Sequence, residues 1–362
     1  MTPLQDLFRL QSQSPWLDNL RRDELLNGHI ADLVERGVRG ITSNPTIFQK
    51  AITSSSAYDS QIAQLKVQGL SVEQIYWELV VSDVVEACSV LSKVFQQSDG
   101  DDGFVSLEVD PHLAADASAT VEMARALAGR VDRPNLMIKV PATVECLPAI
   151  SEILANGISV NVTLIFGLPR YRQVLEAFAA GVRGCMHRNP DKVQALRSVA
   201  SFFVSRVDSA IDPQLERNGH GEWCGQAAVH QARAAYALQS EFFTSHADWI
   251  EMENLGAKRQ RPLWASTSTK NPQYPDLLYV DQLIGPHSVN TLPEQTLLAF
   301  EDHGTVERTI DRDVATSIDF LGRLGSLGIS IDDVADSLER EGIASFAQSF
   351  DQLLEALRAK AQ

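Results

Sequence analysis

The feature of this 362-residue sequence that most restricts its fold is a regular alternation of strand-like and helix-like segments. Eight short runs rich in apolar residues are bounded by glycine, proline or polar residues, which is typical of strands. The eight runs cover residues 14–19, 37–44, 103–110, 136–140, 158–166, 198–208, 262–267 and 277–284. Strands that alternate with helices favour a parallel sheet, and eight such units close into the (β/α)8 TIM barrel.

Helix-like segments separate these runs and also follow the last of them. The clearest covers residues 71–95, where Ser71 suits a helix start and apolar residues recur every three or four positions. The others cover residues 21–36, 114–129, 171–183, 227–255 with a bend, and 293–303. Residues 311–362 are amphipathic and predict additional C-terminal helices, broken at Gly325, Gly328 and Gly342.

The chain is longer than most single domains, but an α/β barrel reaches this length in one domain. Gly, Ser and Pro never cluster into a linker. We therefore expect one barrel domain over residues 1–362, in which residues 311–362 form a helical extension packed on the barrel.

Charge and composition exclude several classes of partner. A net charge of −16 and a pI of about 4.9 argue against nucleic acid and anionic membranes, which need basic patches. The four cysteines are far apart and the eight histidines lack metal-ligand spacing, so we expect no metal site. The N-terminus lacks the regions of a signal peptide, and no apolar run has the length of a membrane span. We expect a cytoplasmic protein.

One lysine interrupts an otherwise apolar strand. Residues 136–140 lie between Pro134 and Pro141 and would be continuously apolar but for Lys139. Burial there removes water and favours the neutral amine, which can attack a carbonyl group and form a Schiff base. The local sequence fits equally well a lysine that reaches solvent or pairs with a carboxylate.

Polar residues recur at the carboxyl ends of seven of the eight predicted strands. Buried polar groups without a function are costly, and the carboxyl ends of barrel strands form the mouth where active sites lie. This pattern predicts a site built from Asp18, Asn44, Glu108, Lys139, Asn161, Thr163, Ser201, Ser205, Arg206, Ser266 and Lys270.

Two segments of the chain resemble the signatures of the transaldolase family. Residues 40–48 (GITSNPTIF) are similar to the first signature, and residues 136–143 (LMIKVPAT) are similar to the second, which holds the Schiff-base lysine. Further family blocks are matched in order by 105–110 (VSLEVD), 160–166 (VNVTLIF) and 201–206 (SFFVSR). The resemblance spans about residues 14–310, and the tail resembles that of the longer bacterial members. It implies the (β/α)8 fold, cytoplasmic pentose phosphate metabolism and no metal.

The resemblance implies catalytic roles for four residues. Lys139 would form an imine with a ketose carbonyl, and Asp18 would take the proton of the C4 hydroxyl as the C3–C4 bond breaks. Glu108 would move protons through a water positioned by Thr163. Locally, Asp18 also fits a helix N-cap, and Glu108 also fits an ion pair with Lys139.

The resemblance also implies residues that bind the substrate. Asn44, Asn161 and Ser201 would bind or support the hydroxyls of a three-carbon unit, although Asn44 before Pro45 also suits a turn. Arg206 would bind the substrate phosphate as a bidentate donor.

The phosphate site departs from the family pattern in one respect. Many transaldolases carry an arginine near the end of the seventh strand, where this chain has Ser266 and, at a shifted spacing, Lys270. We treat both as candidate phosphate ligands, although Lys270 also fits a solvated loop. The local alternative for Arg206 is an ion pair with Asp208 or Asp212.

The resemblance implies a transaldolase that moves dihydroxyacetone from sedoheptulose 7-phosphate to glyceraldehyde 3-phosphate, giving erythrose 4-phosphate and fructose 6-phosphate. Its partners would be sugar phosphates, and it would need no cofactor, because the three-carbon unit is held as an enamine on Lys139. We expect a monomer or homodimer.

The main alternative is a fructose 6-phosphate aldolase, which carries Gln where Glu108 stands and Tyr where Phe203 stands. We expect Phe203 to face the site and keep the enamine dry, although a Phe beside Phe202 also suits the core. A non-catalytic sugar-phosphate-binding barrel would be expected to lack Lys139, Asp18 or Glu108.

Overall fold

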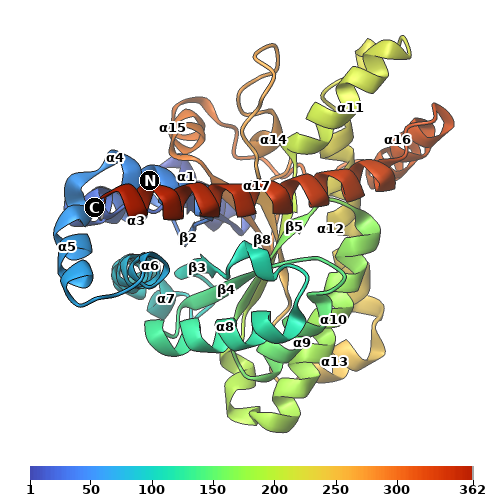
Figure 1. The fold of residues 1–362 in the computed structure, drawn as a ribbon. Helices are drawn as coiled ribbons and strands as arrows, with labels where there is room; N and C mark the ends of the chain where they lie inside the picture. Colours follow the sequence, from blue (N-terminus) through green and yellow to red (C-terminus); the bar gives the residue numbers. More distant parts are fainter. Residues whose placement is uncertain (361–362) are drawn as a thin grey trace.

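Residues 1–360 are described by a computed structural model, in which eight parallel strands close into a barrel in chain order. The strands are β1 (Gln13–Asp18), β2 (Gly40–Thr42), β3 (Phe104–Glu108), β4 (Leu136–Pro141), β5 (Val160–Ile165), β6 (Ser198–Phe203), β7 (Arg261–Ala265) and β8 (Ser288–Leu292). Figure 1 shows the helices around this barrel. The prediction of a (β/α)8 barrel with additional C-terminal helices is therefore confirmed.

Helices form the outer layer and cover both ends of the barrel. They are α1 (Pro3–Gln11), α2 (Arg22–Leu26), α3 (His29–Arg36), α4 (Pro45–Ser54), α5 (Asp59–Val67), α6 (Val72–Val90), α7 (Ser92–Gln97), α8 (Ala117–Val131), α9 (Leu147–Ala155), α10 (Leu168–Arg188), α11 (Ser205–Arg217), α12 (Ala227–Ser245), α13 (Ala247–Asn254), α14 (Leu278–Asp281), α15 (Glu294–His303), α16 (Val314–Ser326) and α17 (Ile331–Lys360). Short 3-10 helices are η1 (Ser56–Tyr58), η2 (Pro111–Leu113), η3 (Pro190–Ala195) and η4 (Gly221–Trp223).

The pairing of neighbouring strands sets the height of each interior side chain. Glu108 on β3 pairs with Lys139 on β4, which in turn pairs with Asn161 on β5. On the other side of the barrel, Asp18 on β1 pairs with Thr42 on β2. Parallel strands covered by helices are buried on both faces, so Thr42, Glu108, Lys139 and Asn161 lie inside the molecule, and Asp18 at the strand end is half-buried.

The prediction of the eighth strand was wrong. Residues 277–284 contain α14, and the closing strand is Ser288–Leu292, which pairs with β1 and β7. A short apolar run fits a buried helix as well as a strand, so its periodicity could not separate the two.

Two other boundaries differ from the prediction. The sixth strand ends at Phe203, and Ser205 begins α11, so Ser205 and Arg206 lie on the first turn of a helix. Gly342 does not break the tail, because α17 continues through it. A Cβ at position 342 would lie 3.0 Å from Leu164, so the missing side chain allows α17 to approach β5 closely.

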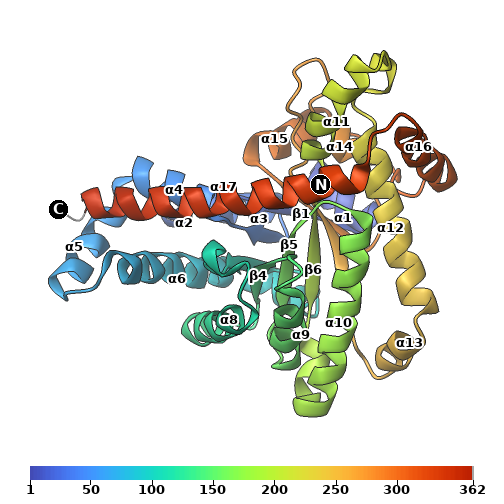
Figure 2. The ribbon, with the colours of Figure 1, turned by 45° about the vertical axis from the view of Figure 1, so that its right-hand side comes forward.

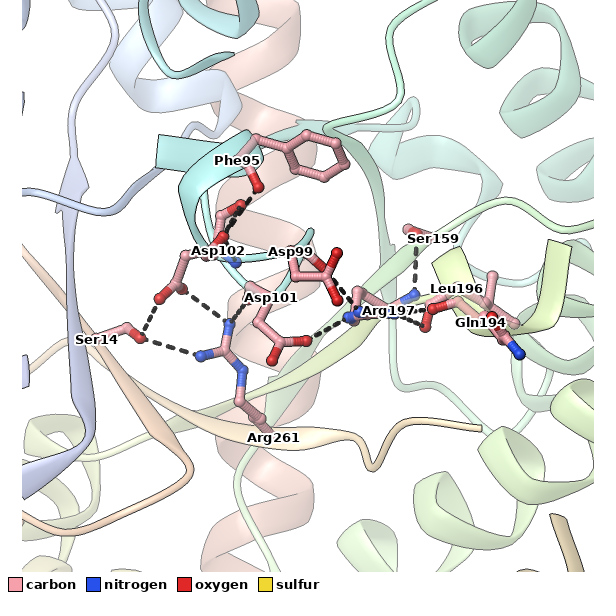
Figure 3. A network of polar contacts seen from close by, with 11 residues as sticks. Ser14, Phe95, Asp99, Asp101, Asp102, Ser159, Gln194, Leu196, Arg197 and Arg261 are labelled. Atoms are coloured by element: carbon pink, nitrogen blue, oxygen red, sulfur yellow. Dashed lines mark hydrogen bonds and ion pairs between the residues drawn. The ribbon is translucent and has the colours of Figure 1, made fainter. Parts of the chain in front are cut away.

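A buried carboxylate ties together the strand starts at the amino-terminal end of the barrel. Asp102 is 1% exposed and accepts hydrogen bonds from Ser14 at 2.7 Å, Arg39 at 2.7 Å and Arg261 at 3.0 Å. Figure 3 shows Asp102 between Ser14 and Arg261. Burial raises the pKa of Asp102, but Arg261 and Arg39 outweigh it and hold that pKa below its ordinary value. The network closes the end of the barrel opposite the mouth.

Removing the Asp102 carboxylate leaves two guanidinium groups without their partner. We expect Asp102→Ala to lower the free energy of unfolding by about 3–5 kcal/mol, measured as a lower urea midpoint by circular dichroism. The matched control is Asp101→Ala, because the Asp101 carboxylate is 56% exposed and its partner Arg197 keeps backbone acceptors. That control should cost at most about 1 kcal/mol. Equal losses in the two variants would show that the buried network does not hold this end together.

Candidate active site

The ammonium of Lys139 lies inside the barrel and does not reach solvent. Its Nζ is 3.2 Å from Glu108 Oε2 and donates to the carbonyl oxygen of Ser43 at 3.2 Å. Lys139 is 4% exposed and Glu108 is 5% exposed. The ion pair that the local sequence allowed is therefore present, and it lies where little water reaches it.

A second carboxylate shares this part of the barrel. Asp18 Oδ1 accepts a hydrogen bond from Thr42 Oγ1 at 2.8 Å, and Thr42 Oγ1 lies 2.6 Å from Thr291 Oγ1. Asp18 is not the N-cap that the local sequence allowed, because α2 is preceded by Arg21. Burial raises the pKa of Asp18 and of Glu108, although Lys139 opposes both shifts. Raised pKa values suit groups that exchange protons.

Hydrogen bonds link three buried polar side chains across the neighbouring strands. Ser201 Oγ donates to Asn161 Oδ1 at 2.7 Å, and Asn161 Nδ2 donates to Ser106 Oγ at 3.0 Å. Thr163, two residues beyond Asn161, is fully buried, and its hydroxyl has no partner among residues 1–360. Buried hydroxyls are normally bonded, so this one is available to a water or a bound molecule.

Asn44 caps a helix, a local role that differs from the turn its sequence suggested. Its Oδ1 accepts a hydrogen bond from the backbone N–H of Ile47 at 3.0 Å and caps α4, and Pro45 occupies the first helical position. This cap fixes the side chain near the carboxyl end of β2. The half-buried amide keeps its NH2 group for a ligand, since no partner of that group is found in the described part of the chain.

Two cations lie near each other at the mouth. Arg206 is half-buried, and its Cζ lies 5.6 Å from the centre of the Phe203 ring. Lys270, on the loop after β7, is exposed, and its Nζ donates to Ser268 Oγ at 2.7 Å. Desolvation lowers the pKa of Lys270, and the charge of Arg206 lowers it further. Like charges held together in this way suit an anion.

Arg206 pairs with neither carboxylate that its local sequence offered. Asp208 accepts from Tyr279 at 2.8 Å, and Asp212 accepts from Tyr274 at 2.6 Å. Within residues 1–360, Arg206 makes no ion pair.

Ser266 lies at the junction between these two segments. Its carbonyl oxygen accepts from the Ser205 N–H at 3.0 Å, and the two hydroxyls are 2.9 Å apart. Ser266 has a left-handed backbone with φ 57°, which turns the chain away from β7 toward Lys270.

The two adjacent phenylalanines on β6 point in different directions, as strand alternation requires. Phe202 packs against Tyr171 and Trp264, with ring centres 5.8 and 6.2 Å apart. Phe203 packs against Phe166 at 5.0 Å and lies beside Arg206. Phe203 therefore lies on the side of β6 that faces the cations.

Sequence reasoning missed the contribution of α17. This helix contacts α4, α11 and β5, and Figures 1 and 2 show it in red, crossing from α16 toward α4 and α5. The centre of the Phe346 ring lies 5.6 Å from Lys139 Nζ, so α17 covers the lysine. The amphipathic tail gave no signal for this contact, because nothing local marks Phe346 among the apolar residues of the helix. Thr42, Ser43 and Ser106 were also missed, although all three are polar residues at predicted strands.

Residues 1–360 contain no group of three or more His, Cys, Asp or Glu side chains placed to hold a metal ion. Among the same residues, no helix is both long enough and apolar enough to cross a membrane.

A closed β/α barrel with a buried lysine–carboxylate pair and a second, half-buried carboxylate at its mouth is the architecture of an enzyme. The chain matches the family model described as Transaldolase/Fructose-6-phosphate aldolase over residues 15–357. It is 51% identical to a transaldolase of Frankia alni over 344 residues, which are 94% of this chain and 92% of the relative. The transaldolase of Thermobifida fusca is 48% identical over 361 residues, 98% of this chain and 97% of the relative. The chain belongs to the transaldolase/fructose-6-phosphate aldolase family and is a transferase of the transaldolase type.

The position of Phe346 can be tested through the accessibility of Lys139. We expect Phe346→Ala to expose Lys139, so that an amine-selective reagent labels this lysine at least about tenfold faster, measured by peptide mass spectrometry. Phe350→Ala is the matched control, because Phe350 is buried on the same helix but packs on Tyr76 and Trp77. Both truncations should lower the thermal midpoint. Equal labelling rates in the two variants would contradict the placement of Phe346 over Lys139.

Proposed function

We propose that this enzyme transfers a dihydroxyacetone unit from sedoheptulose 7-phosphate to glyceraldehyde 3-phosphate, through a Schiff base on Lys139. The products are erythrose 4-phosphate and fructose 6-phosphate. The observation that carries the proposal is the buried Lys139, 3.2 Å from Glu108, in a member of the transaldolase family. A desolvated amine beside a carboxylate is the arrangement that imine chemistry requires.

The reaction begins when Lys139 attacks the C2 carbonyl of the ketose. Loss of water from the carbinolamine gives the imine, and Glu108 moves the protons of this step through a water bound to Thr163. The buried, unpartnered hydroxyl of Thr163 supports this role. The raised pKa of Glu108 supports its alternation between acid and base.

Cleavage of the C3–C4 bond follows. Asp18 takes the proton of the C4 hydroxyl, erythrose 4-phosphate leaves, and the electron pair of the broken bond remains on the three-carbon unit as an enamine. The enamine then attacks the aldehyde carbon of glyceraldehyde 3-phosphate, and Asp18 returns the proton to the new hydroxyl. Hydrolysis of the imine releases fructose 6-phosphate. Asn161, Ser201 and Asn44 hold the hydroxyls of the three-carbon unit.

Several broader features belong to the same proposal. The chain works as one domain, with residues 311–360 as its helical extension; residues 361–362 of the expected extension lie outside the described part of the chain. It acts in the cytoplasm within the pentose phosphate pathway, as a monomer or homodimer, without a cofactor or metal. The family match supports the location and the pathway.

A direct assay separates transfer from the aldolase alternative. With fructose 6-phosphate and erythrose 4-phosphate, we expect sedoheptulose 7-phosphate to form at least about tenfold faster than free dihydroxyacetone. Lys139→Ala should abolish both products. If the wild type released dihydroxyacetone freely without an acceptor aldehyde, the enzyme would be a fructose 6-phosphate aldolase.

Phe203 is the residue expected to decide between transfer and release. A tyrosine hydroxyl at this position would hold a water near the enamine and allow its protonation. We expect Phe203→Tyr to shift the ratio of transfer to release toward release by at least about fivefold. Phe202→Tyr is the matched control, since Phe202 packs against Tyr171 and Trp264 on the other side of β6. A shift of the same size in both variants would contradict the role of Phe203.

Arg206 is expected to bind the phosphate. A charge-assisted hydrogen bond contributes about 1.5–3 kcal/mol, so Arg206→Ala should raise KM for phosphorylated ketoses about 10–150-fold. The variant should leave the reaction of unphosphorylated fructose nearly unchanged. Arg217→Ala, at the exposed end of the same helix, is the control. An equal loss with both substrates would make Arg206 a structural residue.

A further inference from the structure

The helix that carries Arg206 binds the loop that carries Lys270 through one face. Ser205, Asp208 and Asp212 recur on α11 at spacings of three and four residues, so they share a face. Their partners are Ser266, Tyr279 and Tyr274, which lie on the segment after β7. Along the chain, Lys270 lies between Ser266 and Tyr274. Figures 1 and 2 both show α14 beside α11.

Within the described residues, the contacts of this face join two carboxylates to neutral groups and not to cations. Asp208 is 1% exposed and accepts hydrogen bonds from the Tyr279 hydroxyl at 2.8 Å and the Ala228 N–H at 2.7 Å. Asp212 accepts from the Tyr274 hydroxyl at 2.6 Å and the Gly225 N–H at 3.0 Å. A buried carboxylate is costly unless its hydrogen bonds are satisfied, so the tyrosines account for the stability of this arrangement.

Arg206 lies on a different face of α11. Residues one and two apart on a helix do not face each other, so Arg206 points away from the face with Ser205, Asp208 and Asp212. It forms no ion pair in the described residues, and Glu341 on α17 is the acidic group whose charge acts on it. The guanidinium therefore stays available to another anion.

The ring of Tyr274 fits a site shaped for it. Gly225 has φ 76°, and a Cβ at that position would lie 3.0 Å from Tyr274 Cζ, so only a residue without a side chain lets the ring approach. The backbone N–H of Tyr274 also donates to the carbonyl oxygen of Asn271 at 3.1 Å, which closes the turn just beyond Lys270. Tyr274 is therefore held from both sides.

We propose that Tyr274 and Tyr279 are positioning residues of the phosphate subsite. Their hydroxyls hold the loop of Lys270 against α11, the helix that carries Arg206. Both cations are then available to one phosphate group. This inference rests on the proposed function, because it deepens the phosphate-binding role given there to Arg206.

The test compares conservative variants that remove only a hydroxyl. We expect Tyr274→Phe and Tyr279→Phe each to raise, at least about fivefold, both KM for fructose 6-phosphate and the inhibition constant of inorganic phosphate. The kcat and KM for unphosphorylated fructose should stay within about twofold. Tyr236→Phe is the control. Tyr236 is also buried, and its hydroxyl donates to the carbonyl oxygen of Pro286 at 3.0 Å, so it takes no part in the contacts between α11 and the loop after β7. The half-buried Tyr274 keeps the test usable even if Tyr279→Phe fails to fold.

Arg206→Ala and Lys270→Ala distinguish failure of this inference from failure of the proposed function. If both of these weaken inhibition by phosphate but the tyrosine variants do not, the positioning role is overturned and the phosphate subsite stands. If none of the four variants changes inhibition by phosphate, the assignment of the phosphate subsite is wrong, and this inference fails with it.

Discussion

The rest of the site depends on a charged pair held inside an apolar barrel. The ammonium of Lys139 and the carboxylate of Glu108 are 3.2 Å apart, with little access to water. Removing two charges from water costs several kcal/mol for each ion, of which their attraction returns only a part. Proteins tolerate such a cost where a function uses it. The remaining polar groups of the mouth surround this pair, as expected for a site that satisfies its buried charges.

Strand register and one long helix together shape the site. Glu108, Lys139 and Asn161 lie on adjacent strands at paired positions, so the barrel fixes their spacing without help from loops. The helix α17 then covers the mouth and brings Phe346 against the lysine. The cations lie apart from this rigid centre, on the first turn of α11 and on the loop after β7. A substrate with a carbonyl at one end and a phosphate at the other fits this separation.

The sequence predicted the centre of the barrel better than its edges. Lys139, Glu108 and Asp18 were found because charged residues stand out in apolar strands and because the family signatures surround them. The eighth strand was misplaced because residues 277–284 have an apolar pattern that suits both a helix and a strand. Arg206 was assigned to the end of a strand, but it lies on the first turn of a helix at the same mouth. Phe346, Tyr274 and Tyr279 depend on contacts between distant segments, which local patterns do not encode.

The most direct test of the account is reductive trapping of the enzyme with its ketose. The wild type is incubated with fructose 6-phosphate and borohydride, and its peptides are then examined by mass spectrometry. We predict loss of activity and a three-carbon or sugar adduct on Lys139. Trapping should be slower in Glu108→Gln and absent in Lys139→Ala. An adduct on Lys270 or Lys258, or full activity in Lys139→Ala, would contradict the assignment of Lys139 as the lysine that carries the substrate.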